Sequence, residues 1–190
     1  PEERCKILLV FDKLFCLPKS WLNCETEFFV SFFNTMWDTP YVNEAIAILP
    51  SLAHGLQESF FVHSSLFIRK IMDIFSANCT TRSATAIECL STIGKLAVFC
   101  EDCLSYIVME IKNSINLVAI PPIVVQNSLV TLQDLARFDN IELVQRSMMK
   151  MADKYKQSSD IQIRKEAYRL TSILQGNDKT LPTFEKTPGF

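Results

Sequence analysis

The only C-x-x-C motif of the chain is formed by Cys100 and Cys103. Zinc sites use such pairs because two thiolates two residues apart can bind one ion, but a structural zinc needs two further ligands. The only histidines, His54 and His63, lie in an earlier part of the sequence. A thioredoxin-like redox role would need a βαβ context, which the sequence does not predict. We therefore expect Cys100 and Cys103 to be small apolar residues at a junction between helices.

The cysteines and histidines could also serve in nucleophilic catalysis, which needs a base within hydrogen-bond reach of the nucleophile. The spacing of His54 and His63 relative to the cysteines predicts no such pair, and we expect His63 to lie in a capping turn before Ser64. The chain contains neither a Gly-rich phosphate loop nor a kinase signature. We predict that this segment is not an enzyme and has no catalytic residue, no metal ligand and no cofactor.

A basic segment lies toward the C-terminal end of the chain. Residues 140–175 carry seven basic and four acidic side chains, a net charge of +3, whereas residues 1–62 carry four basic and eight acidic side chains, a net charge of −4. Basic residues spaced four apart form a stripe on a helix, which could contact an acidic partner or a nucleic-acid backbone. The candidate contacts are Arg146, Lys150, Lys154, Arg164, Lys165 and Arg169. A solvated helix face is the alternative interpretation.

Aromatic residues gather toward the opposite end, at Phe28, Phe29, Phe32, Phe33, Trp37, Phe60, Phe61 and Phe67. Adjacent residues such as Phe28 and Phe29 point to different sides of a helix, so one helix pair cannot bury all of them. Either an upstream repeat of the same chain or a docked partner helix would cover the excess.

The elements that must position these residues follow a repeat. A small residue begins an apolar helical run at Cys5, Ala45, Ala86, Ser128 and Ala167, at intervals of 40, 41, 42 and 39 residues. A period near 40 is typical of stacked helix pairs, because one pair cannot bury its apolar face until its neighbour covers it. We predict repeat-packing roles for Ala45, Ala86, Ser128, Ala167, Asp160 and Arg164.

Apolar spacing and turn residues predict where the helices lie. Helix 3–17 pairs with a helix ending at 37, 42–56 with 64–75, 82–99 with 102–117 and 123–138 with 141–155, and a last helix spans 160–175. These ranges predict one helical domain over residues 1–176, with about four and a half helix pairs, followed by a polar tail over 177–190.

The composition supports an all-α fold. Among 190 residues, 48% are hydrophobic and only 4 are glycine, which suits long helices and disfavours a β-sandwich with frequent turns. The balance of 19 basic and 21 acidic residues argues against a whole-surface attraction to nucleic acid or an anionic membrane. The longest apolar stretch, 117–125, contains two prolines and is too short to span a bilayer.

The cysteine content bears on the compartment. Seven scattered cysteines, an odd number, and the lack of a signal peptide favour reduced thiols in the cytoplasm or nucleus. The chain begins with Pro1 and its first predicted helix already includes Arg4, so we expect a fragment of a longer intracellular protein.

The sequence from Asp160 to Ala167, DIQIRKEA, resembles the start of a HEAT repeat. The resemblance implies a right-handed α-solenoid in which aspartate and arginine side chains such as Arg164 form polar ladders between successive repeats. Earlier repeats have Asn43 and Arg82 near the arginine position and lack the full motif. Armadillo-like or divergent HEAT packing is therefore the alternative.

A second, fainter resemblance is to the N-terminal solenoid of checkpoint kinases related to phosphatidylinositol 3-kinase. It depends on Glu3-Arg4-Cys5 opening an apolar helix, on Trp21, and on Ile120-Pro121-Pro122 preceding Asp160-Ile161. It implies a regulatory HEAT-repeat region of a large protein kinase that acts in the DNA-damage response.

Taken together, these patterns predict a non-catalytic protein-interaction scaffold, in which stacked helices line up into a concave surface. The expected partners are proteins and adjacent repeats of the same chain, and no membrane. The kinase region and a nucleic-acid contact through the basic residues are the alternatives.

Overall fold

The computed structural model describes residues 6, 10, 26–138 and 141–176. These residues form eight α-helices and two short 3-10 helices, and this part of the chain contains no strand. The α-helices are α2 (Thr26–Asn34), α3 (Val42–Leu56), α4 (Glu58–Asn78), α5 (Ser83–Lys95), α6 (Leu104–Ile115), α7 (Pro122–Ala136), α8 (Glu142–Tyr155) and α9 (Ile161–Leu174), and η2 (Ala97–Phe99) and η3 (Glu101–Cys103) lie between α5 and α6. The predicted all-α fold is therefore confirmed for the described residues. Apart from residues 6 and 10, the predicted helix 3–17 lies outside them, as does the predicted tail 177–190.

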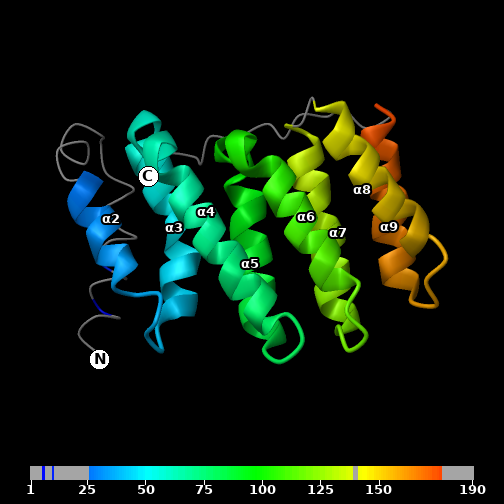
Figure 1. Ribbon diagram of the computed structural model, residues 1–190, viewed down its shortest axis with the longest axis horizontal. Helices are drawn as coiled ribbons and strands as arrows, with labels where there is room; N and C mark the ends of the chain where they lie inside the picture. Colours follow the sequence, from blue (N-terminus) through cyan, green and yellow to red (C-terminus); the bar gives the residue numbers. More distant parts are fainter. Residues whose placement is uncertain (1–5, 7–9, 11–25, 139–140, 177–190) are drawn as a thin grey trace, which may run out of the picture.

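The helices form two rows. In one row α3 packs against α5, α5 against α7 and α7 against α9, and in the other α2 packs against α4, α4 against α6 and α6 against α8. Figure 1 shows the helices side by side from α2 (blue) to α9 (orange). All extensive helix contacts in the described part join helices that are consecutive or next but one along the chain.

Several helix boundaries follow from local signals. Helix α3 has the predicted bounds, and Pro122 begins α7 at the first helical position, where its missing N–H costs nothing. Asp160 caps α9, because its side-chain oxygen accepts hydrogen bonds from the backbone N–H groups of Gln162 (2.8 Å) and Ile163 (3.2 Å). Gly176 follows α9 with φ 76°, a left-handed conformation that glycine adopts readily and that ends a helix.

Helix α4 begins six residues earlier than predicted. Gln57, with φ 46° and ψ −113°, is the single residue between α3 and α4 and has the only positive φ among the described non-glycine residues. This sharp turn lets the chain reverse with no glycine or proline to mark it. As a consequence His63 lies inside α4, and the predicted capping turn before Ser64 is wrong.

The predicted pairing of 82–99 with 102–117 is also wrong, because α5 packs extensively against α4 and hardly touches α6. The connection from α4 to α5 is four residues long, 79–82, which favours antiparallel neighbours. The connection from α5 to α6 instead includes η2 and η3 and carries the chain into the other row.

A continuous apolar core lies between the two rows, and a buried hydroxyl group completes the backbone hydrogen bonding of α3. Pro50 lies inside α3 and has no N–H with which to bond the carbonyl of Ile46. The Thr92 hydroxyl of α5 donates a hydrogen bond to this carbonyl at 3.2 Å, so the buried oxygen has a partner. In α7 the Thr131 hydroxyl similarly lies 3.0 Å from the carbonyl of Leu90 in α5.

None of the helices in the described part combines enough length with enough apolar character to cross a bilayer.

Candidate functional site

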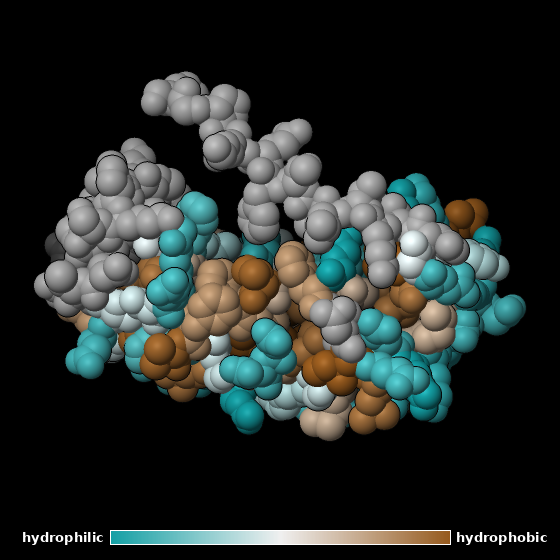
Figure 2. All heavy atoms as spheres, turned by 90° about the horizontal axis from the view of Figure 1, so that it is seen from above, coloured by the Kyte–Doolittle hydropathy of each residue, from teal (hydrophilic) through white to brown (hydrophobic). Residues whose placement is uncertain are grey.

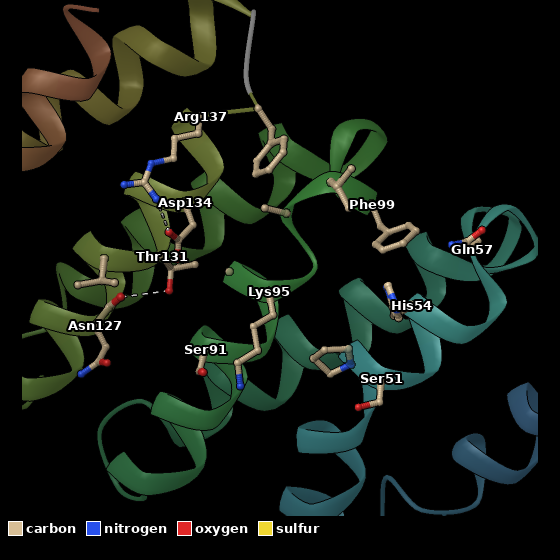
Figure 3. A pocket seen from close by; sticks show the side chains of 16 residues that line it. Ser51, His54, Gln57, Ser91, Lys95, Phe99, Asn127, Thr131, Asp134 and Arg137 are labelled. Atoms are coloured by element: carbon tan, nitrogen blue, oxygen red, sulfur yellow. Dashed lines mark hydrogen bonds and ion pairs between the residues drawn. The ribbon is translucent and has the colours of Figure 1, made fainter. Parts of the chain in front are cut away.

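A groove of about 720 Å³ crosses three successive helices of one row, α3, α5 and α7. Helix α3 contributes Ser51 and His54, α5 contributes Ser91 and Lys95, and α7 contributes Thr131 and its neighbours along one side of that helix. Figure 3 shows the α3 residues on one side, the α5 residues in the middle and the α7 residues on the other side. Residues about 40 positions apart therefore line one surface.

The two ends of the groove differ in chemistry. In Figure 3 the side chain of Lys95 extends toward one end, between Ser51 of α3 and Asn127 of α7, with Ser91 close by. The other end includes Phe99, which follows α5. It is also lined by Val98 and Phe138, which leave 40% and 37% of their surface exposed, so this end offers apolar surface to a ligand.

On the α7 side of the groove, toward the end that includes Phe99, α5 and α7 approach closely. A Cβ added to Gly94 would lie 2.7 Å from Oδ2 of Asp134, so the carboxylate would have to shift if a larger residue stood here. Asp134 accepts a hydrogen bond from Nη1 of Arg137 at 3.3 Å. Burial raises the pKa of the Asp134 carboxyl, and the Arg137 guanidinium offsets part of this rise. The Nε of Arg137 is buried without a hydrogen-bond partner.

The cysteine pair considered for zinc is buried. Cys100 and Cys103 are almost fully inaccessible, and Sγ of Cys100 donates a hydrogen bond to the Leu96 carbonyl at 3.2 Å. Burial, with a smaller effect of Cys103, raises the pKa of the Cys100 thiol far above its usual value, which keeps it in the unreactive protonated form. Within the described ranges, no group of three or more His, Cys, Asp or Glu side chains could hold a metal ion.

The two histidines lie on different helices. His54 is exposed on α3 and lines the groove, whereas His63 lies on α4 and does not. Burial, followed by the charge of Glu88, raises the pKa of the buried Cys89 thiol to about 12.

The predicted basic contacts lie on two helices, outside the groove. Arg146, Lys150 and Lys154 are on α8, where Arg146 pairs with Glu142 and Lys154 donates to Asn116, the residue that follows α6. Their predicted placement on one helix is confirmed. A contact with an acidic partner or a nucleic acid stays a prediction.

The remaining three predicted contacts are on α9. Arg169 pairs with the buried Glu166 at 3.1 Å. The guanidinium of Arg164 donates to the backbone carbonyls of Ser158 (2.7 Å) and Ser159 (3.1 Å), and the exposed Lys165 forms no ion pair with another described residue. Arg164 thus stabilises the turn before its own helix. These hydrogen bonds take the place of the polar ladder between repeats that the HEAT resemblance implies.

The small residues that define the period are inaccessible to solvent where the structure describes them. Ala45, Ala86, Ser128 and Ala167 all have no exposed surface, and Cys5 lies outside the described residues. The Ser128 hydroxyl donates to the Val124 carbonyl at 2.8 Å, which satisfies it within α7. Their burial fits the predicted packing role, which stays a prediction.

The aromatic residues that gather between Phe28 and Phe67 are divided between the core and the surface. Phe29, Phe33, Trp37, Phe60 and Phe67 are buried, whereas Phe28 and Phe61 are about half exposed. The ring of Phe61 lies 4.7 Å from that of Phe99, so the exposed aromatic surface of α4 continues toward the apolar end of the groove.

The groove residues were not identified from the sequence, although the expectation of a surface shared by successive repeats points to this kind of site. One signal was present: Gly94 lies inside an apolar helical pattern, where glycine is unfavourable and often marks a close approach of another element. Its partner Asp134 lies 40 residues away, and no local pattern links the two positions.

Comparison of the chain with models of protein families, with curated proteins and with solved structures finds no match. The resemblances to HEAT and armadillo repeats and to the solenoid of checkpoint kinases therefore stay predictions.

Proposed function

We propose that this chain is a helical-repeat module that binds a protein partner without catalysing a reaction. Its helices form a right-handed α-solenoid, related in packing to HEAT or armadillo repeats, and the partner lies in the groove across α3, α5 and α7. The proposal places the protein inside the cell, in the cytoplasm or nucleus.

The arrangement of contacts supports the solenoid part of the proposal. Each row is built by next-but-one helices, as in stacked repeats whose units contact only their neighbours. The described small residues recur at intervals of 41, 42 and 39 positions and are all buried. Such a module presents an extended surface in place of a deep catalytic cavity.

The observation that carries the binding proposal is the groove itself. Three successive helices of one row line it, and its volume and mixed lining suit a ligand held by apolar contacts and a few polar groups. The Cys100 thiol is buried, and its raised pKa makes it a poor nucleophile.

Site-specific photo-crosslinking tests the proposal. Benzoylphenylalanine would replace Val130 of α7 and Val98 of η2, which both line the groove and are partly exposed, in separate samples. We expect the same polypeptide from an extract of the cells that make the protein to crosslink at both positions. Leu66, exposed on α4 and outside the groove, is the matched control and should not crosslink to it. Equal crosslinking at Leu66, or none in the groove, would contradict the proposal.

A further inference from the structure

The charges that line the groove do not cancel. Asp134 and Arg137 neutralise one another through their ion pair. Lys95 is exposed and forms no ion pair or hydrogen bond with another described residue. Because the remaining titratable lining residue is His54, the groove holds an uncompensated positive charge and no uncompensated carboxylate. Opposite charge in a ligand is therefore favoured at Lys95.

Hydroxyl and amide groups surround this charge. Figure 3 shows Ser51, Ser91 and Asn127 at the same end of the groove as the Lys95 side chain. The Ser91 hydroxyl forms no hydrogen bond with another described residue, so it can donate to a ligand. The Asn127 amide already donates to the Ile123 carbonyl at 2.8 Å. A carboxylate, which only accepts hydrogen bonds, matches the ammonium group of Lys95 and this hydroxyl.

The apolar end provides a second anchor at a fixed distance. Along α7 the positions from Asn127 to Asp134 cover roughly 10 Å at the helical rise per residue. Val98 and Phe138, which line the apolar end, are partly exposed and could receive a large apolar side chain. An extended chain rises about 3.3 Å per residue, so three or four residues would join the two anchors.

We propose that the groove binds an extended segment of a partner protein in which an acidic side chain lies three or four residues from a leucine or phenylalanine. The acidic side chain pairs with Lys95 and Ser91, and the apolar side chain packs against Val98, Phe99 and Phe138. This inference depends on the proposed function and specifies the chemistry of its partner.

Nuclear magnetic resonance titration of the 190-residue chain tests this chemistry, because it detects weak binding and shows which residues are affected. The probe is a synthetic ten-residue peptide of serine and glycine with one glutamate and one phenylalanine four positions apart. Matched peptides carry lysine in place of glutamate, alanine in place of phenylalanine, or the two anchors side by side. We expect amide shifts from the first peptide at groove residues, and at least fivefold weaker binding of each matched peptide.

Substitutions in the protein give a reciprocal test. We expect Lys95→Glu to weaken binding of the glutamate peptide at least tenfold and to strengthen binding of the lysine peptide, while Lys95→Gln gives a smaller loss. Lys112→Glu is the matched control, because Lys112 is also an exposed lysine in the last turn of its helix without an ion pair to a described residue, and it should change the affinity less than twofold. Equal affinity for the glutamate and lysine peptides, or binding unaffected by Lys95→Glu, would overturn the proposal.

Two results that identify a different occupant of the groove would also overturn the proposal. A dimer in sedimentation experiments that Lys95→Glu dissociates would identify a second copy of the chain as the occupant. A peptide of residues 177–190, in which Phe184 and Glu185 are adjacent, would identify that segment if it displaced the probe at equal concentration. The crosslinking experiment distinguishes failure of this inference from failure of the proposed function. If a crosslinked partner binds the Lys95→Glu variant normally, the proposed function stands and only the acidic segment is excluded.

Discussion

The two ends of the described part are held together by different forces. In α2–α4 the core contains a cluster of aromatic rings: the Phe67 ring lies 5.5 Å from that of Phe60 and 6.1 Å from those of Phe33 and Trp37. In α8–α9 the buried side chains are Val144, Met148, Met151, Ala152, Ile163, Glu166, Ala167, Leu170, Thr171 and Ile173, with no aromatic ring. All four ion pairs that join described residues lie between Asp134 and Arg169.

The surface also changes along the molecule: on the face seen in Figure 2, apolar residues gather over the middle helices and hydrophilic residues are more frequent toward α8 and α9. The comparison indicates that aromatic side chains contribute to the core at one end of this helical fold. At the other end, aliphatic and methionine side chains are supplemented by a capping residue and ion pairs.

The largest expected effect is the loss of an aromatic side chain from α4. Phe67 is fully buried, so Phe67→Ala should lower the free energy of unfolding by about 3–5 kcal/mol through lost burial and the resulting cavity. Chemical denaturation followed by circular dichroism measures this. Val62→Ala on the same helix, where 80% of the side chain is exposed, should change stability by less than about 0.5 kcal/mol. Similar values for the two variants would show that the aromatic cluster does not stabilise this end of the molecule.

A smaller effect is expected at the cap of α9. Asp160→Ala removes the acceptor for the N–H groups of Gln162 and Ile163 and should cost about 1 kcal/mol. Asp160→Asn keeps an acceptor oxygen. It should change the free energy of unfolding by only roughly a few tenths of a kcal/mol, which is the spread among good capping residues. Chemical denaturation measures both variants. A loss of stability in the asparagine variant larger than this spread would show that the negative charge matters more than the hydrogen bond.

The C-terminal region should also respond to alkaline pH. The Tyr155 hydroxyl donates to the Ile115 carbonyl at 2.6 Å, and burial raises the pKa of this phenol above its usual value of 10.0. The unfolded chain therefore loses the proton first as pH rises, so the contribution of Tyr155 to stability is complete below pH 10 and declines above it.

Hydrogen exchange measured by mass spectrometry at pH 9 and pH 11 can locate this effect, after correction for the intrinsic rate. We expect the protection of α8 to be lower at pH 11 than at pH 9. Tyr155→Phe should lose the hydrogen bond to Ile115 at both pH values and show little of this further decrease at pH 11. Protection of α8 that is independent of pH in the original chain would contradict the assignment to Tyr155.

The smallest effect is expected from a surface ion pair. Arg146 and Glu142 are both largely exposed on α8, and such pairs contribute only about 0.3–0.5 kcal/mol at helical spacing. Arg146→Gln should therefore lower the unfolding free energy by no more than this, with the difference vanishing in 1 M salt because exposed charges are screened. A loss that persists in high salt would mean that Arg146 contributes through packing.

The sequence was sufficient to predict the elements whose ends carry local signals. Helix α3 has the predicted bounds, and α9 begins after the predicted residue Asp160 and ends before Gly176. The start of α4 could not be predicted, because Gln57 reverses the chain in a conformation that its residue type does not favour. The packing of α5 against α4 follows the short connection 79–82, whereas the predicted pairing assigned α5 to the helix after it.

The groove illustrates the same limit. The sequence marks Gly94 as unusual within a helix, but only the fold brings Asp134 beside it and places Lys95 between α3 and α7. The predicted basic residues on α8 and α9 form a real cluster in sequence, yet four of the six have protein partners in the structure. Charge count alone did not distinguish these satisfied side chains from the unpaired lysine in the groove.

The hydrogen bond from Thr92 to Ile46 limits where the chain can be divided. If a truncated form ended after α4, the Ile46 carbonyl would lose its partner, since Pro50 cannot replace it from within α3. Helix α3 thus obtains part of its backbone hydrogen bonding from α5, and dividing the chain between α4 and α5 would leave this carbonyl to water.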